Sequence, residues 1–290
     1  LSTALLLIST AAAADPVDER RDAAPDATID FEIVTAQIEI IGHDEDYFRL
    51  IGELGDDIEE VKIEGDESEW RIDVKSFEDF ESSRSTNYSE LTLYVPQGSD
   101  VEASAVAGNF QVSELFGASV EIENVSGKIN LRNIGSDQVE VENVSGSIEA
   151  MGVSGSVHDY ETVSGSVIVQ GAQGAIEIET VSGRIELQAS EVTRLSTESV
   201  SGGMELDVDT EPGAALSLNG HSGTIELMLG TDSAPQIEAE TFSGGIRTDW
   251  GNGVSDEMEM GQTLSLDGDS GGVEIEAETF SGRIMIREKG

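Results

Sequence analysis

Residues 120–129 read VEIENVSGKI and residues 139–148 read VEVENVSGSI, so nearly the same ten residues recur after a step of 19. A Ser-Gly pair like the one in these segments occurs ten times, always with an aliphatic residue or Met two positions after the glycine. Most steps between pairs are 18–21 residues, and the step from 243 to 281 is expected to hold two turns of 19, with Ser270 off register. The serines are Ser126, Ser145, Ser154, Ser164, Ser182, Ser201, Ser222, Ser243, Ser270 and Ser281.

A period near 20 residues predicts an all-β fold, a β-solenoid (β-helix-like) with about 20 residues per coil. Each coil would hold two strands of five or six residues and two corners. Glycine suits such a corner because it tolerates positive φ, and the adjacent serine can hydrogen-bond to the turn backbone.

Alignment on the Ser-Gly pair separates an inner from an outer set of residues. Apolar residues four and six positions before the serine, and three after it, alternate with acids and should fill the interior. They include Ile122, Val141, Ile178, Ile129, Ile148 and Ile185, with Tyr160 and His158 in the same inward columns. Three positions before the serine stand Glu123, Glu142, Glu161, Glu179 and Glu198, which should face solvent in one line.

The chain is expected to have four segments. Residues 1–14, LSTALLLISTAAAA, are typical of a truncated secretory signal peptide with a small-residue cleavage site, which predicts an exported protein, periplasmic, on the outer surface or extracellular. Residues 15–27 are charged and predicted as a linker, 28–100 as an irregular β-rich N-terminal region, and 101–290 as the Val-Ser-Gly repeat solenoid. No transmembrane segment is predicted, because the leading apolar stretch is too short to span a bilayer.

The charge balance is strongly acidic: 59 Asp and Glu against 15 Lys and Arg give a net charge of −44. Nucleic acid is therefore excluded as a partner. The acidity fits either a solvated surface adapted to salt or diffuse cation association, and specific Ca²⁺ sites are not expected because the Gly-Gly-x-Gly-x-Asp repeat is absent. The chain has no cysteine, which excludes disulfides and thiolate metal sites.

No catalytic, cofactor-binding or metal-binding residue is predicted, so the protein is not expected to be an enzyme or to need a cofactor. His43, His158 and His221 form no spaced metal pair, and a Ser-Gly pair that recurs ten times is not a singular nucleophile. Arg184, Arg247 and Arg283 follow Ser-Gly pairs and are expected to be exposed surface charges.

Residues 91–98, LTLYVPQG, followed by Ala107-Gly108 and then recurrent Val-Ser-Gly-x-Ile, resemble a family of secreted bacterial β-strand-repeat proteins of unknown function that carry an adhesin label. The resemblance covers roughly residues 28–290. It implies a β-solenoid body, export and no known catalytic residues. His221 and Asp269 depart from the pattern, because they stand where Val125, Val144 and Val181 stand in other repeats.

These observations predict a non-enzymatic exported β-solenoid that acts as an envelope or cell-surface interaction module, adhesin-like, with a surface protein or a glycan as partner. Two alternatives remain: a carbohydrate-active enzyme built on a β-helix, and an envelope sensor or scaffold protein. A groove lined by convergent acids and an arginine would favour the enzyme, and a uniform surface would favour the scaffold or the adhesin.

Overall fold

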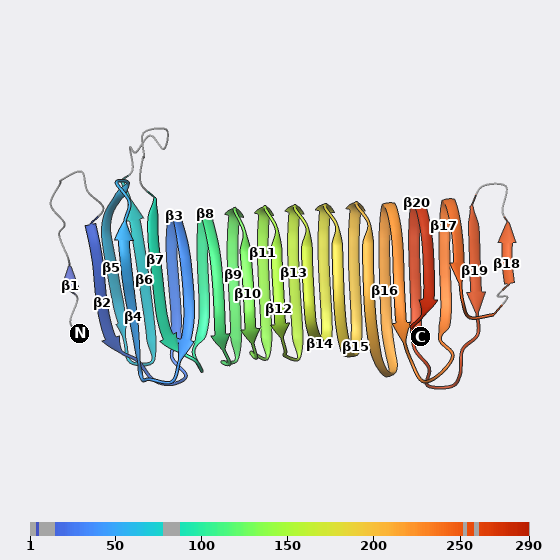
Figure 1. Cartoon of the computed structure of the whole chain (residues 1–290), viewed down its shortest axis with the longest axis horizontal. Helices are drawn as coiled ribbons and strands as arrows, with labels where there is room; N and C mark the ends of the chain where they lie inside the picture. The colour runs from blue at the N-terminus through green and yellow to red at the C-terminus, as the bar shows by residue number, and fades with distance from the viewer. Residues whose placement is uncertain (1–3, 6–14, 78–87, 252–253, 258–260, 290) are drawn as a thin grey trace. The chain divides into compact units, whose positions relative to one another are not determined.

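The computed structural model describes residues 4–5, 15–77, 88–251, 254–257 and 261–289, and every regular element in this part of the chain is a β-strand (Figure 1). The fold is thus all-β and β-solenoid-like, as the repeats predict. The described residues contain no helix long and apolar enough to cross a membrane. The chain divides into two compact units, Leu1–Val144 and Ser145–Gly290.

Unit 1 combines parallel stacking with antiparallel hairpins. The long strand β3 (Thr28–His43) pairs in parallel with β8 (Asp100–Leu115), from Thr28 opposite Asp100 to Ile41 opposite Ser113. The remaining strands are β1 (Ala4–Leu5), β2 (Asp15–Asp22), β4 (Tyr47–Leu54), β5 (Ile58–Asp66), β6 (Glu69–Ser76), β7 (Ser89–Pro96), β9 (Ser119–Ser126), β10 (Ile129–Ile134) and β11 (Gln138–Ser145). Parallel stacking therefore already includes β3, a strand of the N-terminal region expected at residues 28–100.

The linker expected at residues 15–27 is wrong, because β2 occupies Asp15–Asp22 and pairs antiparallel with β4. An ion pair between Asp18 and Arg49 crosses the two strands. The Arg49 guanidinium donates two hydrogen bonds, of 2.8 and 2.7 Å, to the Asp18 carboxylate, and Arg20 lies 3.8 Å from the centre of the Tyr47 ring. The predicted signal peptide falls largely on residues outside the described part, which includes only Ala4 and Leu5 of it.

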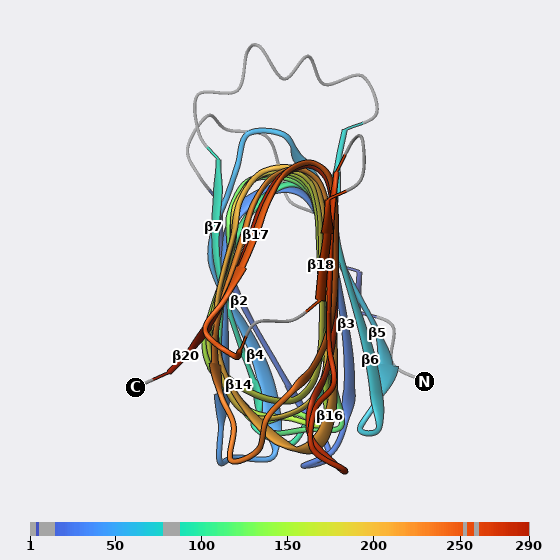
Figure 2. The same ribbon diagram turned by 90° about the vertical axis from the view of Figure 1, so that its right-hand side faces the viewer.

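Unit 2 is a stack of parallel strands in near-constant register. Ile185 lies opposite both Val167 and Met204, and Ser201 opposite both Ser182 and Ser222, so successive coils differ by 18–21 residues. Seen end-on, these coils overlap as flattened loops (Figure 2). The strands are β12 (Ile148–Val153), β13 (Val157–Ser164), β14 (Val167–Ser182), β15 (Ile185–Ser201), β16 (Met204–Gly230), β17 (Gln236–Thr248), β18 (Val254–Glu257), β19 (Gln262–Leu266) and β20 (Glu274–Glu288).

The predicted interior columns are confirmed. Ile178, from the strand before the Ser-Gly corner, and Ile185, from the strand after it, are both fully buried. The other members named above, Ile122, Val141, Ile129, Ile148, Tyr160 and His158, are fully buried as well. In each coil, alternation brings one set of apolar side chains inward from both strands.

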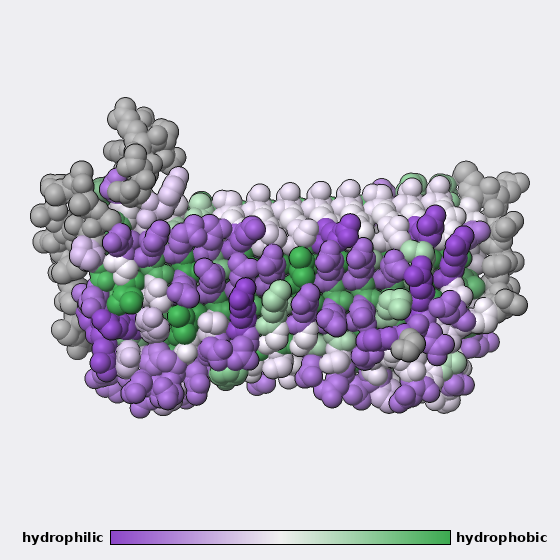
Figure 3. All heavy atoms as spheres, in the orientation of Figure 1, coloured by the Kyte–Doolittle hydropathy of each residue, from purple (hydrophilic) through white to green (hydrophobic). Residues whose placement is uncertain are grey.

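The glycine corners also stack as predicted. In unit 2, a Cβ added to Gly165, Gly183 or Gly202 would overlap the carbonyl oxygen of the corner glycine in the preceding coil. Successive corners therefore approach too closely for any side chain. The face visible in Figure 3 is largely hydrophilic, and a row of near-neutral residues follows its upper edge, where the strands of each unit turn (Figure 3).

The expected order of the last coils is wrong. Rather than adding two turns beyond Ser243, the chain returns: β20 lies between β16 and β17, with Ser281 opposite both Ser222 and Ser243. Beyond β17 the pairing becomes antiparallel, through β19 and then β18. Equal spacing of repeats predicted the coils but not their order in space.

Candidate interaction face

Except for the buried Val153 and the acidic Asp269, the residue directly before the Ser-Gly pair is apolar or aromatic and points outward. In unit 2 these residues follow one another from strand to strand and form what we call the apolar ridge: Val163, Val181, Val200, His221, Phe280 and Phe242. Val200 is 43% exposed and Phe280 50%, whereas Thr180 and Ser199, one position earlier on their strands, are buried. Strand alternation therefore places one large side chain per coil in solvent.

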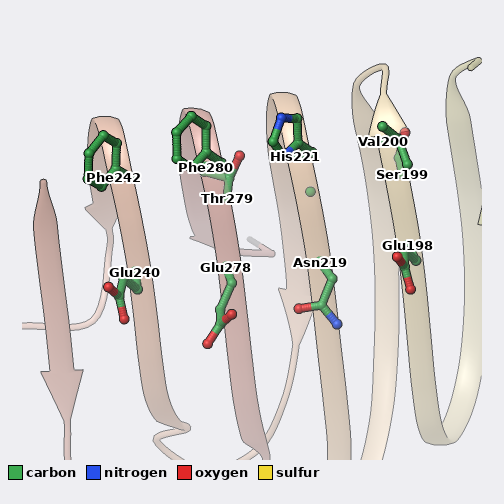
Figure 4. A pocket seen from close by; sticks show the side chains of 11 residues that line it. Glu198, Ser199, Val200, Asn219, His221, Glu240, Phe242, Glu278, Thr279 and Phe280 are labelled. Atoms are coloured by element: carbon green, nitrogen blue, oxygen red, sulfur yellow. The ribbon is translucent and has the colours of Figure 1, made fainter. Parts of the chain in front are cut away.

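Three rings stack at one end of the apolar ridge. The His221 and Phe280 ring centres are 5.1 Å apart with planes 5° from parallel, and those of Phe280 and Phe242 are 4.8 Å apart and 7° from parallel. Figure 4 shows the three rings in one row on neighbouring strands (Figure 4). Since each ring covers the face of the next, the row presents mainly ring edges to solvent.

Carboxylates occupy most of the two other outward positions on the same strands, and Ser196, Ser217 and Asn219 hold the remaining ones. Across residues 158–163, 176–181, 195–200, 216–221, 237–242 and 275–280, all of them described, there is no Lys or Arg. The acids in these segments are Asp159, Glu161, Glu177, Glu179, Glu198, Glu238, Glu240, Glu276 and Glu278. We call these segments together, with their apolar ridge, the acidic face.

The predicted glutamate column is present within each unit. Glu161, Glu179 and Glu198 are register partners in unit 2, and all but the half-buried Glu179 are exposed. Burial, followed by the charges of Glu161 and Glu198, raises the pKa of Glu179. In unit 1, Glu123 and Glu142 are exposed. The like charges of this column thus repel one another.

An open groove with a volume of about 430 Å³ lies between the rings and the carboxylates. Its walls include His221, Phe242 and Phe280 on one side and Glu198, Glu240 and Glu278 on the other, with Asn219 in the place of a glutamate. Such a groove offers apolar contact and negative charge together.

The cations of unit 2 lie mainly on the strands after the Ser-Gly corner. Arg184 pairs with Glu205 at 3.0 Å, Arg287 with Glu226 at 3.0 Å, and Lys289 with Asp207 at 2.7 Å. Arg184, Arg247 and Arg283 are exposed, as predicted. Positive charge is thereby kept largely apart from the acidic face; Arg194 is the exception, because it lines a groove with Glu238 and Glu276.

Unit 1 carries a related groove of about 780 Å³. It is lined by the exposed Val34, Val106, Val125 and Val144, with Glu123 and Glu142 beside them. A cation is present here, because Lys75 also lines the groove and donates to Glu60 at 3.2 Å.

The three histidines occupy three different environments. The His43 ring accepts a hydrogen bond from the Glu45 amide at 3.0 Å, His221 belongs to the apolar ridge, and His158 is fully buried. Among the described residues, no group of three or more His, Asp or Glu side chains could hold a metal ion. A separate groove in unit 2 brings Arg194 near Glu238, Glu274 and Glu276.

The apolar ridge was not among the features predicted from the sequence. The signal was available: the position before Ser-Gly is Val, Phe or His in coil after coil, and alternation with the inward columns places it outside.

Comparison with protein families identifies the class of protein. The Toastrack DUF4097 family model matches residues 29–287, and the chain belongs to that family. A comparison with curated proteins finds no significant match.

Several solved structures align with this chain over most of their length, but their TM-scores with it are below 0.5. A candidate adhesin from Bacteroides fragilis NCTC 9343 is 9% identical, with 94% of this chain and 97% of that chain covered and a TM-score of 0.42. A candidate adhesin from Parabacteroides distasonis ATCC 8503 is 9% identical, with 95% and 97% covered and a TM-score of 0.42. A candidate lipid-binding protein from the same strain is 10% identical, with 94% and 97% covered and a TM-score of 0.33. At TM-scores this low, no function can be transferred from them.

Proposed function

We propose that this protein is a non-enzymatic, exported β-solenoid that serves as an envelope or cell-surface interaction module, and that unit 2 binds a basic, amphipathic protein segment through its acidic face. The observation that carries the proposal is the apolar ridge, one exposed side chain per coil, bordered by carboxylates with no Lys or Arg among them. Exposed apolar rows are typical of interaction surfaces.

The chemistry of the acidic face favours a protein over a glycan or a nucleic acid. A sugar would stack on an open ring face, but both faces of Phe280 are occupied, by His221 and by Phe242. Nucleic acid would be repelled by the carboxylates. A strand that alternates basic and apolar residues would meet both columns at once, because its side chains repeat with the same period of two.

Export is proposed from the apolar, small-residue pattern of residues 1–14. Membership of the Toastrack DUF4097 family agrees with a β-solenoid body.

The enzyme alternative has one observation in its favour, the groove that joins Arg194 to Glu238, Glu274 and Glu276. Against it, Glu238 and Glu276 stand five positions before their serines, where Glu121, Glu140 and Glu177 stand in other coils. A repeated column lacks the singular environment that catalysis needs. A scaffold protein would differ from the proposed interaction module only in that its acidic face binds no ligand.

The test is a titration of the full chain with a fluorescent dodecapeptide of alternating Lys and Val. Three comparisons accompany it: the peptide with Glu for Lys, the peptide with Ser for Val, and neutral oligosaccharides. We expect anisotropy to report saturable binding of the Lys-Val peptide alone, weakening as salt is raised. Equal binding of the Lys-Ser peptide, or binding of an oligosaccharide instead, would contradict the proposal.

A further inference from the structure

Two strands of unit 2 share an identical octapeptide. The sequence IEAETFSG occupies residues 237–244 in β17 and residues 275–282 in β20. The strands pair in parallel with each residue of one opposite the same residue of the other, Ile237 opposite Ile275 and Gly244 opposite Gly282. The chain thus carries two equivalent candidates for one place in the stack.

The place next to β16 is held by the strand that is later in the chain. β20 pairs with β16 from Ala215 opposite Glu274 to Leu229 opposite Glu288. β17 pairs with the other edge of β20 and, on its own other edge, with β19. We call the place of β20, between β16 and β17, the C-terminal slot. β17 could fill it without strain, because Ser243 follows Ser222 by 21 residues, the same step as from Ser201 to Ser222.

The residues after the octapeptide explain why β20 holds the slot. Ile286 is fully buried in the slot, whereas the matching residue of β17 is the polar Thr248, which is half-buried. The end of the chain adds ion pairs to β16, since Lys289 lies 2.7 Å from Asp207 and 2.9 Å from Asp209. These contacts lie outside the octapeptide, so within it β17 could replace β20 with the same side chains.

We propose that the C-terminal slot is an exchange site, at which the C-terminal strand of a second copy of this chain replaces the chain's own. When β20 leaves, β17 can pair with β16 through the shared octapeptide, so the edge of β16 need not be exposed during exchange. Reciprocal exchange of an identical element links two copies at little cost, because the interactions that β20 makes within one copy form again between the two copies. The proposal is independent of the proposed function.

The absence of cysteine makes a direct test available. Ser222 and Ser281 are register partners on neighbouring strands, a separation that a disulfide can bridge. The full-length single variants S222C and S281C are mixed, incubated and mildly oxidised. A covalent heterodimer that accumulates with incubation time and concentration is the expected result. A mixture of S222C with S243C is the control, since Ser243 lies one strand further from Ser222.

The double variant S222C/S281C shows that the strands are in place, by forming the bond within one chain. If that bond forms while the mixed single variants give no more heterodimer than the control mixture, the proposal is overturned.

A second pair of variants tests the part played by β17. In the slot, Thr248 would take the buried place of Ile286 opposite Leu227. The variant T248I should therefore speed heterodimer formation by about tenfold, from the added apolar burial, and T248S should not. Equal rates for the two variants would overturn the β17 step.

Discussion

At the scale of single residues, the corner glycines are required by close approach as much as by backbone dihedral. Gly202 has φ near 158°, and a Cβ there would overlap the carbonyl oxygen of Gly183. Its neighbour Gly203 has only the carbonyl oxygen of Thr224 at 3.5 Å from such a Cβ. The sequence agrees, because the position of Gly203 is filled by Ser, Lys, Arg or Thr after most of the other Ser-Gly pairs.

The two neighbouring glycines therefore give a matched pair of variants. Gly202→Ala should lower the free energy of unfolding by more than about 2 kcal/mol, and Gly203→Ala should change it by less than about 1 kcal/mol. Urea denaturation monitored by circular dichroism measures both. Similar losses in the two variants would mean that the corners are less tightly stacked than described.

His158 is an ionisable ring in the interior of unit 2. It is fully buried, lies opposite Ile176 in register, and stacks at 6.3 Å with the buried Tyr160. Its ring nitrogens have no partner in good hydrogen-bond geometry, although backbone groups of Gly155 and Gln173 are near. Burial lowers the pKa of His158 below its usual value, so the ring is neutral in the folded protein.

The lowered pKa of His158 makes the folded protein less stable as pH falls. As pH falls below about 6.5, the His158 imidazole becomes protonated in the unfolded chain but stays neutral in the folded chain. The free energy of unfolding therefore falls by up to about 1.4 kcal/mol per pH unit. His158→Leu should reduce this slope by placing an apolar residue in an apolar column, and His43, whose pKa burial also lowers, should retain part of it. The exposed His221→Leu is the control. Melts between pH 7 and pH 5 that are equally steep in wild type and His158→Leu would contradict the assignment.

At the scale of strands, the period and the alternation were readable from the sequence because each coil repeats one pattern of inward and outward residues. That pattern predicted the buried faces, the stacked corners and the exposed glutamates. The order of β16, β20 and β17 could not be read in this way, since β17 and β20 share an octapeptide. The buried Ile286, which stands where β17 has Thr248, and the ion pairs of Lys289 distinguish β20 from β17. β2 was missed because its charges resemble those of a linker until their partners on β4 are known.

The alternation gives a further matched pair within β14. Ile178→Ala should lower the free energy of unfolding by about 2–5 kcal/mol, through lost burial and the cavity left behind. Val181→Ala, on the same strand but 48% exposed, should cost less than about 1 kcal/mol. Denaturant titration measures the free energy of unfolding of both variants. A larger loss in Val181→Ala than in Ile178→Ala would mean that the buried and exposed faces of β14 are assigned the wrong way round.

At the scale of the whole molecule, a net charge of −44 lowers the stability of the folded chain, because its many carboxylates repel one another. Thermal stability should rise with ionic strength, and NaCl should substitute for CaCl₂ at matched ionic strength, because screening rather than coordination relieves the repulsion. Melting temperatures measured in NaCl and in CaCl₂ at the same ionic strength distinguish screening from coordination. A large, saturable Ca²⁺ shift, abolished by Glu161→Gln with Glu179→Gln, would instead establish a calcium site.

The central claim, that the apolar ridge and its carboxylates form the binding face, is tested most directly by removing rings without altering charge. The double variant Phe242→Ser/Phe280→Ser is compared with Met228→Ser/Met285→Ser, which removes half-exposed apolar side chains from the strands after the Ser-Gly corners. The dissociation constant of the Lys-Val peptide should rise at least about tenfold in the first variant and stay within about twofold of wild type in the second. Unchanged affinity in the first variant, with its melting curve intact, would contradict the claim.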